Sequence, residues 1–87
     1  MQRPRMFDVV KLRVDAEGIR FDDDDMGDVV VTKGEEGTII EEFQRPDEAY
    51  LIEFVNDFGE VTAMVTVRAD QFDVVWRADT AAVEIGA

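Results

Sequence analysis

The sequence predicts an all-β protein in which five short strands curl into a small barrel. Hydrophobic residues make up 46 % of the 87 residues and alternate with polar residues over most of the chain, which is the period of a half-buried strand. β-Branched and aromatic residues dominate the alternating runs, and glycine and proline lie between them. A chain of this length forms one small domain. We expect that domain to span residues 1–76, followed by a C-terminal tail at residues 77–87.

Five runs carry the alternation and define the expected strands: FDVVKLRV (7–14), GTIIEEF (37–43), AYLIEFVN (49–56), VTAMVTV (61–67) and FDVVW (72–76). In each run, the apolar side chains of one parity are expected on the core face. They are Val10, Leu12, Val14, Ile39, Phe43, Tyr50, Ile52, Phe54, Val61, Ala63, Val65, Val67, Phe72, Val74 and Trp76. Glu41 shares the parity of Ile39 and Phe43, so we expect a bulge or strong bend in that strand. We expect Trp76 to plug the core rather than to form a recognition platform.

The segments between the runs predict tight turns. Gly34 and Gly37 lie in KGEEG, where a reversal requires positive φ. Pro46 cannot donate to a ladder and therefore starts a loop. Gly59 in NDFGE is expected in the left-handed position of a hairpin loop. The segment RADQF is too short for an α-helix and predicts one 3₁₀ turn at a sharp corner before the last strand.

Five short strands with brief connections cannot bury both faces of a flat sheet. Closing the sheet into a barrel buries one face and removes the edges, so the predicted architecture is an SH3-like barrel. The first connection, residues 15–33, is longer than the others and holds two apolar triplets, IRF and VVV, on either side of an acidic run. This pattern predicts a long hairpin arm in the first loop.

Asp22, Asp23, Asp24, Asp25 and Asp28 form the acidic run of this arm. We expect the run to lie at the solvent-exposed tip of the arm, where water screens the repulsion between like charges. A calcium loop would need an acid or an amide immediately before its glycine, and the sequence has a methionine there. No specific metal site is therefore predicted, and weak binding of divalent cations is kept as an alternative.

The net charge of −12, from 21 acidic and 9 basic residues, restricts the partners. An acidic surface repels nucleic-acid phosphate and anionic lipid, so we expect neither a nucleic acid nor a membrane as partner. The same charge keeps a small protein soluble and can attract a basic partner. The chain has no cysteine, which excludes disulfides and fits a reducing compartment. No apolar run suggests a signal peptide or a membrane span, and we expect a cytoplasmic protein.

The residue types argue against catalysis. Histidine, cysteine and serine are absent from the sequence, which excludes Ser-His-Asp and Cys-His catalysis within one chain and a histidine zinc site. Paired carboxylates can perform acid–base chemistry, but they need a cleft that raises one pKa, and a small barrel has a filled interior. We therefore expect no enzyme, no catalytic residues and no cofactor.

The order of four motifs resembles a family of small bacterial proteins classed as a domain of unknown function. The motifs are FDVVKL, KGEEGTIIEEF, AYLIEFVNDFGE and VTVRADQF, and the resemblance covers residues 6 to 76. It implies an SH3-like barrel and transfers no catalytic residue. The stretch GIRFDDDDMGDVVV departs from the family pattern as an apparent insertion. The stretch GDVVVTKGEEGTII is also similar to KOW elements in outline, but its acidic turn argues against RNA binding.

The expected role is a non-catalytic binding or accessory module that contacts another protein, with a basic partner favoured by the charge. The arm of residues 19–32 is the expected contact surface, and strand addition at an open edge of the barrel is the second route. The candidate contact residues are the five aspartates of the acidic run and Phe58, the aromatic residue that we expect to be exposed in the NDFGE turn. One alternative is an immunity- or antitoxin-like inhibitor that shields a basic nuclease by imitating nucleic-acid charge. The other alternative is a weak divalent-cation-binding protein.

Overall fold

The structure, a computed structural model, describes residues 3–22, 25–44 and 47–78. Its strands are β1 (Val9–Leu12), β2 (Ala16–Asp22), β3 (Asp25–Val31), β4 (Glu36–Phe43), β5 (Ala49–Val55), β6 (Val61–Val67) and β7 (Phe72–Trp76). A 3₁₀ helix, η1 (Ala69–Gln71), directly precedes β7 and confirms the predicted corner. Within these ranges no helix has the length and apolar character needed to cross a membrane.

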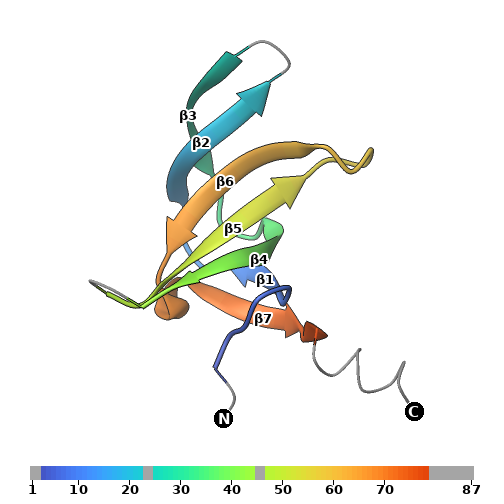
Figure 1. Cartoon of the computed structure of the whole chain (residues 1–87). Helices are drawn as coiled ribbons and strands as arrows, with labels where there is room; N and C mark the ends of the chain where they lie inside the picture. Colours follow the sequence, from blue (N-terminus) through green and yellow to red (C-terminus); the bar gives the residue numbers. More distant parts are fainter. Residues whose placement is uncertain (1–2, 23–24, 45–46, 79–87) are drawn as a thin grey trace.

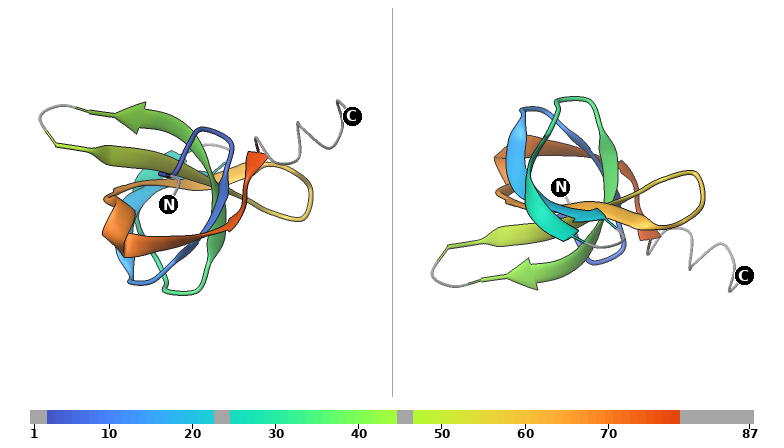
Figure 2. Two further views of the ribbon diagram at one scale, coloured as in Figure 1. Left: turned by 90° about the horizontal axis from the view of Figure 1, so that it is seen from below. Right: turned by 90° about the horizontal axis from the view of Figure 1, so that it is seen from above.

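All seven strands form one antiparallel sheet in the order β3-β2-β6-β5-β4-β1-β7. The prediction of an all-β fold is confirmed, and the prediction of five strands is wrong because the two apolar triplets of the first connection form two further strands. The sheet curls around a common centre (Figure 2), but it is not closed: β3 and β7 end the order and do not pair with each other. β2 pairs with β6 over residues 18–20, and the hairpin then continues past β6 (Figure 1).

The core lies on the inner face of the curled sheet. Its buried apolar residues are Val10, Leu12, Ala16, Val31, Ile39, Tyr50, Ile52, Phe54, Ala63, Val65, Val67 and Phe72. The rings of Tyr50 and Phe72 meet edge to face, with centroids 5.5 Å apart and an interplanar angle of 87°, a favoured arrangement of aromatic pairs. Most of the residues predicted for the core face are therefore buried.

Three bulges explain most of the errors in the predicted core. The pairing register shifts between Ile39 and Glu41, which confirms the bulge predicted in that strand. A bulge adds one residue and reverses the side-chain parity beyond it, so Phe43 lies on the outer face and is 39 % exposed. Shifts in the β5–β6 and β1–β7 pairings likewise turn Val61 outward to half-buried and leave Trp76 48 % exposed. The prediction that Trp76 plugs the core is wrong.

The glycine predictions are correct at two positions and wrong at one. Gly34 and Gly59 have φ of 97° and 80°, the left-handed region expected for their turns. Gly37 instead lies inside β4, where an added Cβ would come within 2.6 Å of both the Glu53 carbonyl oxygen and Ile52 Cγ2. It is needed for close packing and not for a turn. Val14 is 38 % exposed because β1 already ends at Leu12.

Candidate functional site

The arm predicted in the first connection is present as the β2–β3 hairpin. The two strands pair without interruption from Ala16–Val31 to Asp22–Asp25. Two residues, 23 and 24, connect them and lie outside the described residues. The hairpin forms the upper end of the molecule in Figure 1.

The inner side of the arm is fixed to the core at its base. Ala16 and Val31 are buried, and Val29 packs against the core cluster. Gly18 pairs with Val65 of β6, and a Cβ at position 18 would collide with the Met64 carbonyl oxygen. The strands β2 and β6 therefore lie so close at this point that only a glycine fits. This close packing fixes the base of the arm.

The outer side of the arm is an apolar surface with acids between its members. Ile19, Met26 and Val30 are 45 %, 61 % and 53 % exposed. We call this surface the arm face and define it by six residues whose parity is opposite to that of the buried ones: Glu17, Ile19, Phe21, Met26, Asp28 and Val30. Exposed apolar groups bordered by charges are typical of protein contact surfaces.

Two pockets are lined by residues of the arm. A pocket of about 380 Å³ is lined by Glu17, Gly18, Asp28, Val29 and Val30. A second open pocket, of about 370 Å³, lies between β3 and the neighbouring ends of β5 and β6; its lining residues are Arg20, Val29, Val30, Val31, Thr32, Glu35, Phe54, Thr62 and Ala63. Space for a ligand therefore exists beside β3, in pockets whose walls also include residues of β2.

The aspartates chosen from the sequence are only partly described. Asp28 is exposed and belongs to the arm face. The predictions for Asp23 and Asp24 fall outside the described residues, and so do the side chains of Asp22 and Asp25, whose backbones end the two strands. Within the described ranges no three acidic side chains converge as ligands for a metal ion.

Phe58 lies in the β5–β6 turn and is 87 % exposed, as expected. The Asn56 side-chain oxygen accepts hydrogen bonds from the Phe58 and Glu60 amides at 2.9 and 3.1 Å, which stabilises the turn. This turn projects in a different direction from the arm (Figure 1). The turn that carries Phe58 is therefore separate from the arm that carries Asp28.

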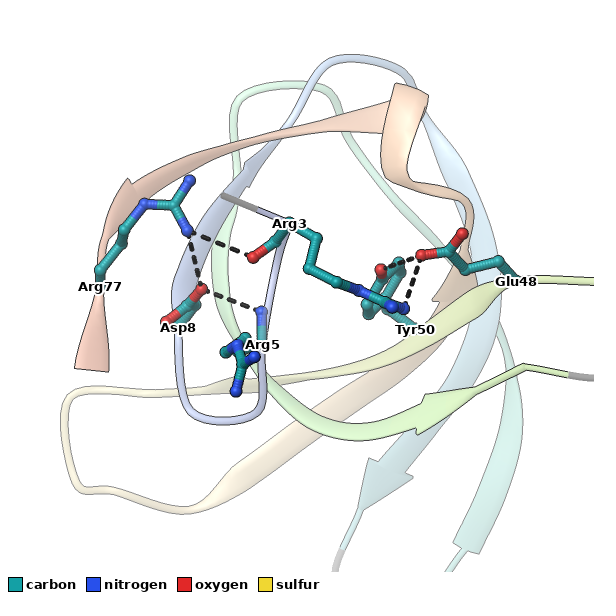
Figure 3. A network of polar contacts seen from close by, with 6 residues as sticks. All are labelled: Arg3, Arg5, Asp8, Glu48, Tyr50 and Arg77. Atoms are coloured by element: carbon teal, nitrogen blue, oxygen red, sulfur yellow. Dashed lines mark hydrogen bonds and ion pairs between the residues drawn. The ribbon is translucent and has the colours of Figure 1, made fainter. Parts of the chain in front are cut away.

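A buried carboxylate that the sequence analysis missed fixes the N-terminal segment to the end of β7 (Figure 3). Asp8 is 1 % exposed. Its Oδ2 accepts a hydrogen bond from the Arg5 amide and its Oδ1 accepts one from the Ala78 amide, each at 3.0 Å. Arg77 Nη1 lies 3.7 Å from Asp8 Oδ2. The signal available in the sequence was the position of Asp8 at core parity, two residues before Val10.

A second polar group in Figure 3 joins Arg3, Glu48 and Tyr50. The Tyr50 hydroxyl donates to Glu48 Oε1 at 2.6 Å, and Arg3 Nη2 donates to the same oxygen at 2.9 Å. Burial, followed by the hydrogen bond to Glu48, raises the pKa of Tyr50 above its ordinary value. The hydrogen bond with Tyr50, followed by the charge of Glu48, raises the pKa of Arg3. Both polar groups connect the N-terminal segment to the sheet, and Arg3 and Arg77 also line a pocket of about 490 Å³ beside β7.

Comparison with known proteins agrees with the resemblance seen in the motifs. No curated protein and no solved structure matches the chain. Residues 6–74 match the family described as "Domain of unknown function (DUF4926)". This range includes β1, the whole arm, the core strands and most of β7. The chain therefore belongs to the family described as "Domain of unknown function (DUF4926)".

Proposed function

We propose that this protein is a small, acidic, non-catalytic module that binds another protein through the arm face. The observation that carries the proposal is the exposure of three large apolar side chains, Ile19, Met26 and Val30, on one side of a firmly anchored hairpin. Burying such groups against a partner is favourable at roughly 25 cal/mol per Å². We also propose that the protein acts in the cytoplasm, which agrees with the absence of cysteine.

The charge of the arm supports a basic partner. Residues 16–31 contain six acids, namely Glu17, Asp28 and the four aspartates at 22–25, against the single base Arg20. Opposite charges across an interface increase the association rate and select the partner. The rate should therefore fall as salt is added.

The fold is further proposed to be of the SH3-like kind. The support is the order β7-β1-β4-β5-β6, with a long hairpin between the first two of these strands in the sequence and a 3₁₀ turn before the last. On this view β2 and β3 are an enlarged first loop, and the binding surface lies on that loop.

Capture from the producing cell with arm variants tests the function. The variant Met26→Gln/Val30→Thr removes apolar contact area from the arm face, and Val55→Thr/Val75→Thr changes two side chains of similar exposure elsewhere. We expect a specific partner that the first variant loses and that the control and the unchanged protein retain. Equal capture by both variants would show that the contact lies elsewhere.

A second candidate function is inhibition of a basic nuclease in the manner of an immunity protein or antitoxin. The net charge of −12 favours it, because a surface this acidic can imitate nucleic acid. An adjacent gene that encodes a basic toxin, together with inhibition of that toxin by this protein, would support the candidate. The third candidate, weak binding of divalent cations, is tested by a calcium titration followed through the amide shifts of residues 22–28.

A further inference from the structure

β3 is a complete strand with one unpaired side. It pairs with β2 along all seven of its residues, and none of the described strands pairs with its other side. An unpaired edge offers backbone N–H and C=O groups to another chain, and proteins commonly protect such edges with lysine, proline or a bulge. The sequence of β3, DMGDVVV, contains neither lysine nor proline, and its pairing with β2 has no register shift.

The register identifies the backbone groups that face outward. Asp22 and Asp25 flank a two-residue connection, so they form a hydrogen-bonded pair, and such pairs alternate along the hairpin. Met26, Asp28 and Val30 are then in the non-hydrogen-bonded positions, and their N–H and C=O groups point away from β2.

The close contact of Gly18 with β6 agrees with this assignment. If Gly18 is hydrogen-bonded to β3, its pair with Val65 of β6 is of the non-hydrogen-bonded kind, in which the strands approach most closely. An added Cβ at position 18 would indeed lie 2.6 Å from Val65 Cγ1. Both observations place the free backbone groups of β3 at the same three residues.

The opposite edge of the sheet, on β7, is not equivalent. The N-terminal segment lies beside it: Arg77 Nη1 donates to the Arg3 carbonyl oxygen at 3.4 Å, and Arg3 and Pro4 line a pocket together with Phe72 and Val74. Within the described residues, no comparable segment is hydrogen-bonded along the free side of β3. β3 is therefore the better candidate edge for an added strand, because the N-terminal segment does not lie beside it.

The side chains of the three outward-facing residues define which strand fits. Met26, Asp28 and Val30 all belong to the arm face. Every second side chain of an added strand would therefore lie beside one of them, with the acidic Asp28 between the apolar Met26 and Val30. Glu17 lies diagonally from Asp28 on the same face and adds a second carboxylate. The complementary sequence has a lysine or arginine in the middle, with an apolar residue two positions before it and another two positions after it.

The same acid opposes pairing of β3 with a second copy of the chain. In an antiparallel pair centred on Asp28, two aspartates would lie opposite each other, and like charges in that position are destabilising. Each copy also carries a net charge of −12. The edge is therefore suited to a strand of opposite charge from a different protein.

We propose that β3 binds an extended segment of a partner protein by strand addition, with a basic side chain beside Asp28 and apolar side chains beside Met26 and Val30. This inference rests on the proposed function and specifies its geometry. It differs from general contact with the arm face because main-chain hydrogen bonds supply part of the affinity and alternate side chains supply the selection.

Short peptides with defined backbones test the proposal. The probe is acetyl-Thr-Val-Thr-Arg-Thr-Val-Thr-amide, titrated into isotope-labelled protein. Two derivatives carry N-methyl groups on alternate amides, one set on each edge of the extended peptide. A further derivative replaces its arginine by glutamate. We expect the probe to slow amide exchange at Met26, Asp28 and Val30, and we expect only one of the two N-methylated peptides to bind.

The charge contribution is measured by a double-mutant cycle. Replacing the arginine of the probe by glutamate should weaken binding by about 3–10-fold, the range for changing a favourable cross-strand pair into an unfavourable one. Asp28→Asn should reduce that difference to less than about twofold. Asp57→Asn, which changes an exposed acid of the β5–β6 turn, should leave it unchanged.

The outcomes separate this inference from the proposed function. Absence of binding at millimolar peptide, equal binding of both N-methylated peptides, or exchange protection away from β3 would each overturn strand addition. If Met26→Gln/Val30→Thr still abolishes capture of a cellular partner, the arm face remains the contact surface and only its geometry was wrong. Protection of the three amides by self-association in the absence of peptide would show that a second copy occupies the edge.

Discussion

Truncation of Ile52 to alanine probes the core on which the arm is built. Ile52 is completely buried in β5 and pairs with Ile39 on one side and Val65 on the other. The change removes three carbon atoms, and at about 0.8 kcal/mol each their loss from the core costs about 2.4 kcal/mol. The cavity that remains adds about 24 cal/mol per Å³ of unrelaxed volume. We therefore expect Ile52→Ala to lower the free energy of unfolding by about 2–5 kcal/mol.

Urea denaturation followed by the fluorescence of the single tryptophan measures this loss. Val55→Ala is the matched control, since Val55 lies in the same strand but is 53 % exposed, and its effect should stay within about 0.5 kcal/mol. If Ile52→Ala prevents folding, Ile52→Val should still give a measurable loss of about 0.5–1.5 kcal/mol. A loss below about 1 kcal/mol for Ile52→Ala, or equal losses for Ile52→Ala and Val55→Ala, would refute the assignment of the inner face.

Three further predictions address single features of the scaffold. Because the pKa of Tyr50 is raised in the folded state, its contribution to stability should be complete below pH about 10 and should decline as pH rises through the folded pKa; unfolding of Tyr50→Phe should lack this alkaline component. Gly37→Ala should cost about 1–3 kcal/mol by overpacking, and an unchanged urea midpoint would contradict the close contact with Ile52. Asp8→Ala should cost about 1–3 kcal/mol because the part-buried amides of Arg5 and Ala78 lose their acceptor, and thermal unfolding that matches the unchanged protein would contradict that role.

The sequence predicted the strands well wherever the alternation of side chains was uninterrupted. Tyr50, Ile52 and Phe54 were assigned to the core by parity, and all three are buried. The 3₁₀ corner and the hairpin arm were also predicted, because their turn residues and apolar triplets are local signals. The resemblance to a domain of unknown function was also confirmed, since residues 6–74 match such a family.

The errors occurred where the pairing of strands changes the face that a residue occupies. Phe43 and Trp76 follow register shifts, and each is turned outward although its spacing matched the core pattern. Only the shift near Glu41 had a signal in the sequence, namely a charge at core parity. The closed barrel was wrong for a related reason: which edges meet is decided by long-range pairing, and alternation within one strand carries no information about it.

The sequence predicted the arm of the candidate site but not the apolar surface on it. The acidic run indicated that the arm is a candidate site. The apolar residues beside it were predicted only to form the strands of the hairpin, and their exposure was not predicted. Only the register of β2 against β3 showed that Ile19, Met26 and Val30 share one side. The open edge of β3 became visible only from the strand order of the whole sheet.

The bond from Arg77 to the Arg3 carbonyl oxygen has a practical consequence for experiments with this protein. It holds the two ends of the described chain next to each other, at the opposite end of the molecule from the arm (Figure 1). A fluorophore or surface tether attached at either end of the described chain would therefore leave the β2–β3 hairpin unobstructed. Sensors that report on ligand capture can be built at these ends without disturbing the surface that they monitor.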